Sequence, residues 1–283
     1  MPTEPAEIST SRQPVRPRVG SAPLPLTRGI DHTVAYWELL SNLVSRDLKT
    51  RYRGSVLGVF WSLLNPLLLM LVYTVVFSVI VRVNIQPYPI FLLSGLVPWN
   101  IFAQTLTIAT TSVTDNAGIV RKVYFPLVIL PLSAVASTGV HMLISLGLLA
   151  VLAIAFHVGI GLSLVFLPLL VVLQILFSTG IGCLLAAGQV YFRDVQYFLS
   201  VLITVWFFGT PIVYSLDLVP QRLRPFFEAN PMSWLISSYQ DIWFYRRMPS
   251  FLHLVAFTVV AALVVLVGLS AYDRLSRGFA EEV

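Results

Sequence analysis

The residues that could carry chemistry are few in this chain, and their spacing excludes one energy source. The phosphate-binding loop of many ATPases places Gly directly before its Lys, because glycine-rich backbone must wrap the phosphates beneath the amine. The two lysines are Lys49, which follows Leu48, and Lys122, which follows Arg121. Neither can serve in such a loop. The sequence therefore predicts that this chain does not hydrolyse ATP in that manner.

Three histidines lie within or beside apolar stretches, namely His141, His157 and His253. No Asp or Glu accompanies them there, so the sequence lacks the ion-binding acid that a proton- or sodium-driven carrier needs. A neutral His bonded to a helix carbonyl explains each of them, although a membrane-bound transferase that uses His141 or His157 stays open as an alternative. Cys183 has no Cys or His at metal-ligand spacing, so no metal site is expected. If this chain moves a solute, the energy must then come from a partner chain.

Aromatic residues make up 12% of the chain, and several of them cluster. Rings near the ends of membrane spans belong to the usual interfacial belt. Trp206, Phe207 and Phe208 fall within the apolar stretch 195–214, which predicts a membrane span. They lie away from its ends, so an interfacial belt explains them less well. Aromatic faces stack on sugar rings without fixing any charge. A pore lined in this way is suited to a sugar polymer that must slide.

The composition is that of an integral membrane protein. Of the 283 residues, 57% are hydrophobic and 11% are charged, whereas a soluble domain has roughly 25% charged residues. A net charge of +5 would suggest nucleic acid as the partner of a soluble chain. Most of the cations here lie beside apolar spans, so a membrane orientation signal explains them and no nucleic-acid partner is expected.

Six apolar stretches predict an all-α membrane protein with six transmembrane helices. They cover residues 56–81, 90–113, 127–156, 164–190, 195–214 and 251–272. We expect a disordered cytoplasmic tail over 1–30, an amphipathic interface helix over 31–53 and the six-helix domain over 54–283. Residues 215–250 hold charged and aromatic side chains together, which predicts short helices that dip into the outer leaflet. Asn230-Pro231 is a favourable start for one of them.

The predicted helix at 31–53 is basic and amphipathic. Its apolar residues recur at three- and four-residue steps, at Trp37, Leu40, Val44 and Leu48. Its cations are Arg46, Lys49, Arg51 and Arg53. Cations mark the cytoplasmic side of a multi-pass protein. With both termini inside, 13 of the 18 Lys and Arg residues fall on that side, so we expect both termini to be cytoplasmic.

Several segments resemble the signature of ABC-2 type permeases. They are RDLKTRY at 46–52, SVLG at 55–58 and WSLLNP at 61–66. LSGLVPW at 93–99, Arg193-Asp194-Val195 and Asn230-Pro231 match the same pattern. Within this family the chain looks like the polysaccharide exporters for O-antigen, capsule and teichoic acid. The likeness is strong over residues 37–73 and reaches the sixth span in spacing.

The resemblance implies a permease that exports a lipid-linked polysaccharide across the cytoplasmic (inner) membrane. The assembly would be a homodimer in membrane lipid with two ATPase subunits, which bind ATP and Mg²⁺, so no cofactor is expected in this chain. A drug or small-lipid ABC-2 exporter is the alternative.

The same resemblance implies three groups of site residues. The sugar channel would be lined by Trp61, Tyr73, Phe77, Trp99, Phe102, Trp206, Phe207 and Phe208. An outer gate would comprise Phe226, Phe227, Trp234, Tyr239 and Trp243. Coupling to the ATPase would involve Arg46, Lys49, Arg51, Asp115, Arg121 and Lys122.

Overall fold

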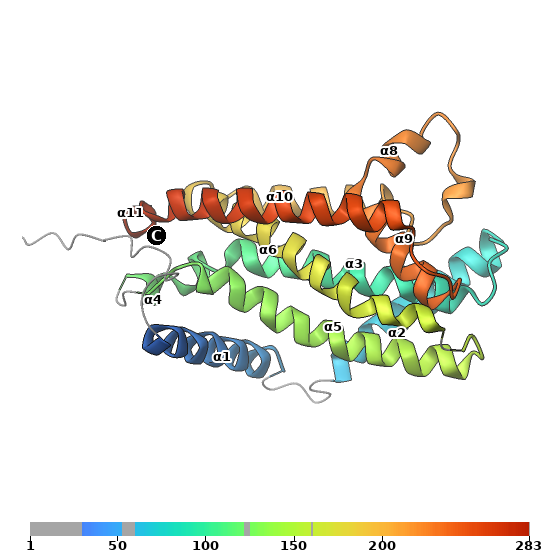
Figure 1. Ribbon diagram of the computed structural model, residues 1–283, viewed down its shortest axis with the longest axis horizontal. Coiled ribbons are helices and arrows are strands. Elements are labelled where there is room, and N and C mark those ends of the chain that lie inside the picture. Colours follow the sequence, from blue (N-terminus) through green and yellow to red (C-terminus); the bar gives the residue numbers. More distant parts are fainter. Residues whose placement is uncertain (1–29, 53–59, 122–124, 160, 283) are drawn as a thin grey trace, which may run out of the picture.

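The computed structural model describes residues 30–52, 60–121, 125–159 and 161–282, and this part of the chain is helical without strands (Figure 1). This agrees with the predicted all-α class. The α-helices are α1 (Ile30–Tyr52), α2 (Phe60–Thr74), α3 (Tyr88–Thr111), α4 (Ala117–Val120), α5 (Ile129–Ala155), α6 (Leu167–Tyr191), α7 (Val195–Phe208), α8 (Arg224–Glu228), α9 (Pro231–Trp243), α10 (Phe251–Ser276) and α11 (Phe279–Glu282). The predicted tail over 1–30 lies outside the described residues except for its last position.

Four helical segments in the described part are long and apolar enough to cross a membrane. They are α3, α5, α10 and the segment Leu162–Tyr191, which includes α6. Two apolar helices are shorter, namely Leu64–Ile80, formed by α2 and a π-helical continuation, and α7. All six correspond to predicted spans, although α7 ends at Phe208, before the predicted limit of 214.

Figure 1 shows α3, α5, α6 and α10 side by side, with α1, α4 and α11 toward one end of this bundle and α8 and α9 toward the other. One end holds α1, α4 and α11, and we call it the α1 end. The opposite end holds α8 and α9, and we call it the α9 end. The predicted inner segments and the predicted outer region therefore lie at opposite ends of the molecule.

Helix α3 is the centre of the bundle, and most of its residues are buried. It contacts α2, α5, α6, α7 and α9. Pro98 stands inside α3 and leaves it unbroken, although a proline interrupts helical hydrogen bonding. Gln174 of α6 donates its Nε2 hydrogen to the Pro98 carbonyl at 2.8 Å. A side chain of a neighbouring helix thus bonds the backbone of α3 at the proline.

Helix α1 packs on α5. Leu43 is its buried residue, and Leu39 and Leu40 pack beside it. Trp37, one of the apolar residues of the predicted amphipathic helix, is 71% exposed. The apolar residues of α1 form two adjacent stripes, and hydrophobicity alone does not distinguish the stripe that meets α5.

Two hydrophobic clusters hold the described helices together. The larger cluster surrounds α3 and extends to α5, α6, α9 and α10. The smaller one lies at the α1 end and joins α1, α4, α11 and the adjoining ends of α5, α6 and α10. Helices α1, α4 and α11 therefore share a hydrophobic core at the α1 end.

Candidate functional site: an aromatic seam and its two ends

An aromatic seam joins α2, α3 and α7. The Trp99 ring centroid lies 5.8 Å from Phe102, 6.2 Å from Trp206 and 5.8 Å from Phe207. Phe207 in turn stacks on Tyr73 of α2, at 6.2 Å. Separate helices thus bring most of the predicted channel rings together. Contacts of this kind contribute about 0.5–1.5 kcal/mol each beyond their area burial.

The remaining predicted channel residues lie at the margins of the seam. Phe77 lies 6.2 Å from Tyr73, and Phe208 lies 5.2 Å from Phe207. Trp61 is twelve positions before Tyr73, which is about 18 Å along a helix, and it is 46% exposed. The seam therefore includes every predicted channel ring except Trp61.

Burial divides the seam into an inner and an outer part. Trp99 and Phe102 are buried inside the subunit, so in this conformation they lie behind its surface. Trp206 and Phe207 are partly buried, whereas Phe208 is 61% exposed. Sequence reasoning missed two further exposed rings of α7, Tyr197 and Phe198. The sequence could have indicated them, because they lie on the same short apolar helix as Phe208.

Asn230 joins the end of α7 to the start of α9. Its Oδ1 accepts hydrogen bonds from Trp206 Nε1 at 2.9 Å and from the Met232 amide at 3.0 Å. Its Nδ2 donates to the Gly209 carbonyl at 2.9 Å and to Thr210 Oγ1 at 3.0 Å. One side chain thus caps α9, as the sequence predicted, and also bonds the carbonyl just beyond α7.

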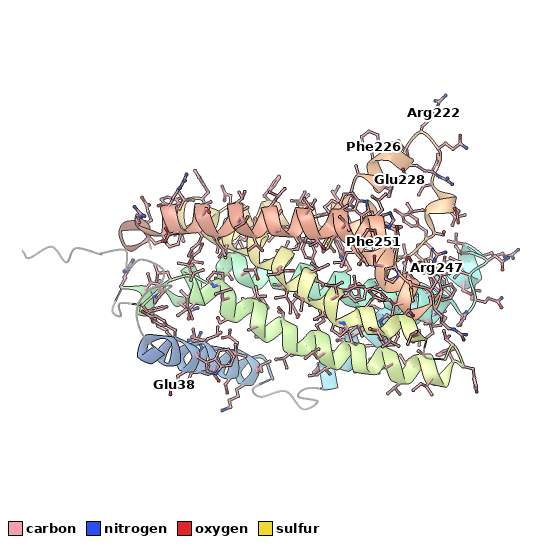
Figure 2. The ribbon with its side chains drawn as sticks, viewed as in Figure 1. Glu38, Arg222, Phe226, Glu228, Arg247 and Phe251 are labelled. Atoms are coloured by element: carbon pink, nitrogen blue, oxygen red, sulfur yellow. The ribbon has the colours of Figure 1, made fainter. Side chains whose placement is uncertain are left out.

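The predicted outer-gate residues lie at the α9 end but do not form one cluster. Phe226 of α8 is exposed and projects away from the bundle (Figure 2). Phe227 meets Tyr214 edge-on at 6.2 Å, and Trp234 Nε1 donates to the Glu228 carbonyl at 2.6 Å. The other two predicted gate residues, Tyr239 and Trp243, are buried in the main core.

Sequence reasoning missed a buried carboxylate at the α9 end. The Asp241 side chain is 7% exposed and accepts a hydrogen bond from Arg247 Nε at 2.7 Å. Arg247 also lies over the Tyr245 ring, 4.7 Å from its centroid. Burial raises the pKa of Asp241 above its ordinary value, although the hydrogen bond and charge of Arg247 act in the opposite direction.

The predicted coupling residues lie at the α1 end, where the structure describes them. Arg46 Nη2 donates to Asn116 Oδ1 at 2.9 Å, which links α1 to the 3₁₀ turn Thr114–Asn116. Lys49, Asp115 and Arg121 are exposed. Lys122 and the side chain of Arg51 lie outside the described part. Asp115 and Arg121 thus lie in the connection between α3 and α5, and Arg46 of α1 bonds to it.

A family model for the ABC-2 type transporter matches residues 38–244. The chain belongs to this family. It is 37% identical over 250 residues to the O-antigen export system permease protein RfbA of Myxococcus xanthus, a match that covers 88% of this chain and 96% of the relative. It is 33% identical over 247 residues to the protein of the same name from Klebsiella pneumoniae, covering 87% and 95%.

The transferase alternative gains no support in this ABC-2 chain. His141 is buried in α5, and His157 follows the end of that helix, about 20 Å away at the helical rise per residue. Among the described residues, no group of three or more His, Cys, Asp or Glu side chains could hold a metal ion. The side chains that come together from separate helices are the aromatic rings of the seam. Rings between apolar helices suit a membrane transport subunit.

Proposed function

We propose that this chain is the permease subunit of an ABC exporter that moves a lipid-linked polysaccharide outward, powered by a separate ATPase subunit. The observation that carries the proposal is the match to permeases named for O-antigen export, over 95% or more of their length. The aromatic seam supports it, because rings offer a sugar polymer stacking surfaces without fixed charge.

The proposed topology has six crossings with both termini in the cytoplasm. The crossings are α2 with its π-helical continuation, α3, α5, α6, α7 and α10. Figure 1 shows α3, α5 and α6 running in alternate directions between the α1 end and the α9 end, which supports this topology. The excess of Lys and Arg in the segments assigned to the α1 end supports its placement in the cytoplasm.

The channel in this proposal lies between two copies of the chain, at the faces of α2 and α7. Helix α7 has 14 residues, about 21 Å, whereas the hydrocarbon core of a bilayer is about 30 Å thick. Irregular backbone at membrane depth is tolerated only where it is buried in protein or lines a water-filled cavity. The exposed rings Tyr197, Phe198 and Phe208 form the sugar path, and Trp99 and Phe102 support them from behind.

The ATPase contacts the α1 end in this proposal. The exposed charges of Lys49, Asp115 and Arg121 suit a polar protein surface that forms and separates during each cycle. The hydrogen bond between Arg46 and Asn116 makes α1 move with the turn after α3. Closure of the ATPase pair would then displace both elements together.

The test compares cells that lack this chain, cells that lack its ATPase and cells with both. Surface polysaccharide is oxidised with periodate and labelled with a membrane-impermeant hydrazide dye, and internal polymer is measured after lysis. The proposal expects polymer to accumulate inside in both deletions. Normal surface polymer in either deletion contradicts it. A drug or small-lipid exporter would instead leave surface polymer normal and change drug resistance or lipid distribution.

A further inference from the structure

The connection between α3 and α5, residues 112–128, is held at both of its ends by side chains of other helices. On the α3 side, Arg46 of α1 donates to Asn116 Oδ1 at 2.9 Å. On the α5 side, the Tyr272 hydroxyl of α10 donates to the Leu127 carbonyl at 2.9 Å. These partners are 70 and 145 positions apart in the chain. Two distant helices therefore bond the described parts of this connection, residues 112–121 and 125–128.

The Tyr272 bond falls where α5 begins. The Leu127 carbonyl also accepts a hydrogen bond from the Leu130 amide at 3.1 Å, within the first turn of that helix. Tyr272 itself is 1% exposed and belongs to the smaller hydrophobic cluster with Val120 of α4. A shift of the connection must therefore either move Tyr272 or break its bond.

The Tyr272 ring is held in turn by α11. Phe279 is fully buried and meets Tyr272 edge-on, with centroids 5.4 Å apart and planes at 88°. Tyr191, at the end of α6, lies 6.0 Å from Phe279 and donates its hydroxyl hydrogen to the Leu275 carbonyl of α10 at 2.8 Å. The last turns of α6 and α10 and the short α11 thus form one packed unit around Tyr272.

Helix α10 is also joined to α6 near its middle. A Cβ on Gly268 would lie 2.2 Å from the Gly180 carbonyl oxygen, so the two backbones are in direct contact. Close backbone approach of this kind favours movement of the two helices as a pair. A displacement that reaches Tyr272 therefore acts on both membrane-spanning helices.

We propose that Tyr272 and Phe279 are positioning residues that transmit movement of the described parts of this connection, residues 112–121 and 125–128, to α10 and α6. This inference rests on the proposed function, in which the ATPase pushes on that connection. The ATPase contact uses exposed charges, whereas this transmission uses a buried hydroxyl and a buried ring. Loss of the Tyr272 hydroxyl should leave the ATPase bound but reduce the export obtained from each ATP.

The test uses two tyrosines that each donate one hydrogen bond to a backbone carbonyl. Tyr272→Phe removes the bond to the connection, and Tyr191→Phe, the matched control, removes a bond between α6 and α10 only. Each variant is co-purified with its ATPase in lipid nanodiscs for ATP hydrolysis. The same variants in cells are assayed for surface polymer with the hydrazide label, normalised to permease level.

Tyr272→Phe is expected to keep ATPase co-purification and ATP hydrolysis within about twofold of wild type while surface polymer falls about three- to tenfold, the range that loss of one hydrogen bond corresponds to. Tyr191→Phe is expected to export normally, because the Gly180–Gly268 backbone contact still joins α6 to α10 and the bond from Tyr272 to Leu127 is kept. Equal export by the two variants, or parallel loss of hydrolysis and export in Tyr272→Phe, overturns the inference.

If Tyr272→Phe does not assemble, Phe279→Leu replaces it, because leucine keeps apolar bulk without the ring that holds Tyr272. The same uncoupling is expected, and normal export by Phe279→Leu overturns the inference. Absence of export by the wild-type complex would instead overturn the proposed function. The two failures are therefore distinguishable.

Discussion

The contact between Gly180 and Gly268 gives the sharpest test of the packing. In Gly268→Ala the new Cβ would lie 2.2 Å from the Gly180 carbonyl oxygen and 2.8 Å from its Cα. An ordinary carbon–oxygen contact is about 3.3 Å or longer. The backbones of α6 and α10 would have to separate by about 1 Å, because no side chain stands there to rotate away.

The magnitude follows from two opposing terms. Replacing a helical Gly by Ala stabilises the helix by about 1 kcal/mol, and overpacking a close contact costs about 1–3 kcal/mol or more. Gly147→Ala in α5 is the matched control, because nothing lies within 4 Å of its added Cβ. Gly147→Ala therefore gains the helix stabilisation of about 1 kcal/mol without the cost of overpacking. The difference between the two variants, about 1–3 kcal/mol, therefore measures the contact itself.

The chain carries its own reporter for this measurement. Cys183, the sole cysteine, is fully buried on α6 close to Gly180, and it reacts with a fluorogenic maleimide only when the helices open. In a thermal scan of purified protein, Gly268→Ala should open roughly 2–12 °C below Gly147→Ala, at about 2–4 °C per kcal/mol. Coincident midpoints for the two variants would refute the backbone contact.

Two further predictions concern the α9 end, and the same thermal scan measures both. Asn230→Ala should destabilise the protein by about 2–4 kcal/mol, because it leaves Trp206 Nε1 and the Gly209 carbonyl without their partner. Asn230→Asp keeps the acceptor and should lose less stability. Equal loss of stability in the two variants would contradict the role of Asn230 as an acceptor. Arg247→Ala should cost about 1–3 kcal/mol by leaving the Asp241 carboxylate buried without its partner, whereas adding Asp241→Asn should recover most of that loss. Because burial raises the pKa of Asp241, the penalty in Arg247→Ala is present above the folded-state pKa and should shrink as the pH falls toward about 4. This pH series is read by tryptophan fluorescence, since maleimide reacts with the thiolate and is slow in acid. A penalty that grows on acidification would contradict the burial of this charge.

Much of the helical framework could be predicted from the absence of charge along the chain. The stretches predicted at 90–113 and 251–272 correspond to α3 at Tyr88–Thr111 and α10 at Phe251–Ser276. The stretch at 195–214 was too long, because the apolar run continues past the end of α7. Pro211, which cannot continue helical hydrogen bonding, was the available signal for that end.

Contacts that depend on tertiary packing could not be predicted in the same way. The bond from Tyr272 to the Leu127 carbonyl joins residues 145 positions apart, and its acceptor is backbone that any residue type would provide. The Asp241 carboxylate belongs to residues 215–250, which were predicted to form short helices at the outer leaflet, and only the fold buries it beside Arg247. The rings of α3 could be recognised as aromatic, but whether Phe102 faces the interior or a surface depends on how α6 and α7 pack against it.

The central claim is that this ABC-2 chain is a conduit driven by an ATPase that it does not contain. The most direct measurement reconstitutes the purified chain in vesicles, alone or with its ATPase, and follows entry of lipid-linked polysaccharide extracted from the same cells. We predict ATP-dependent transport only when both proteins are present and the ATPase keeps its phosphate-binding Lys. Net uphill transport by this chain alone would contradict the account.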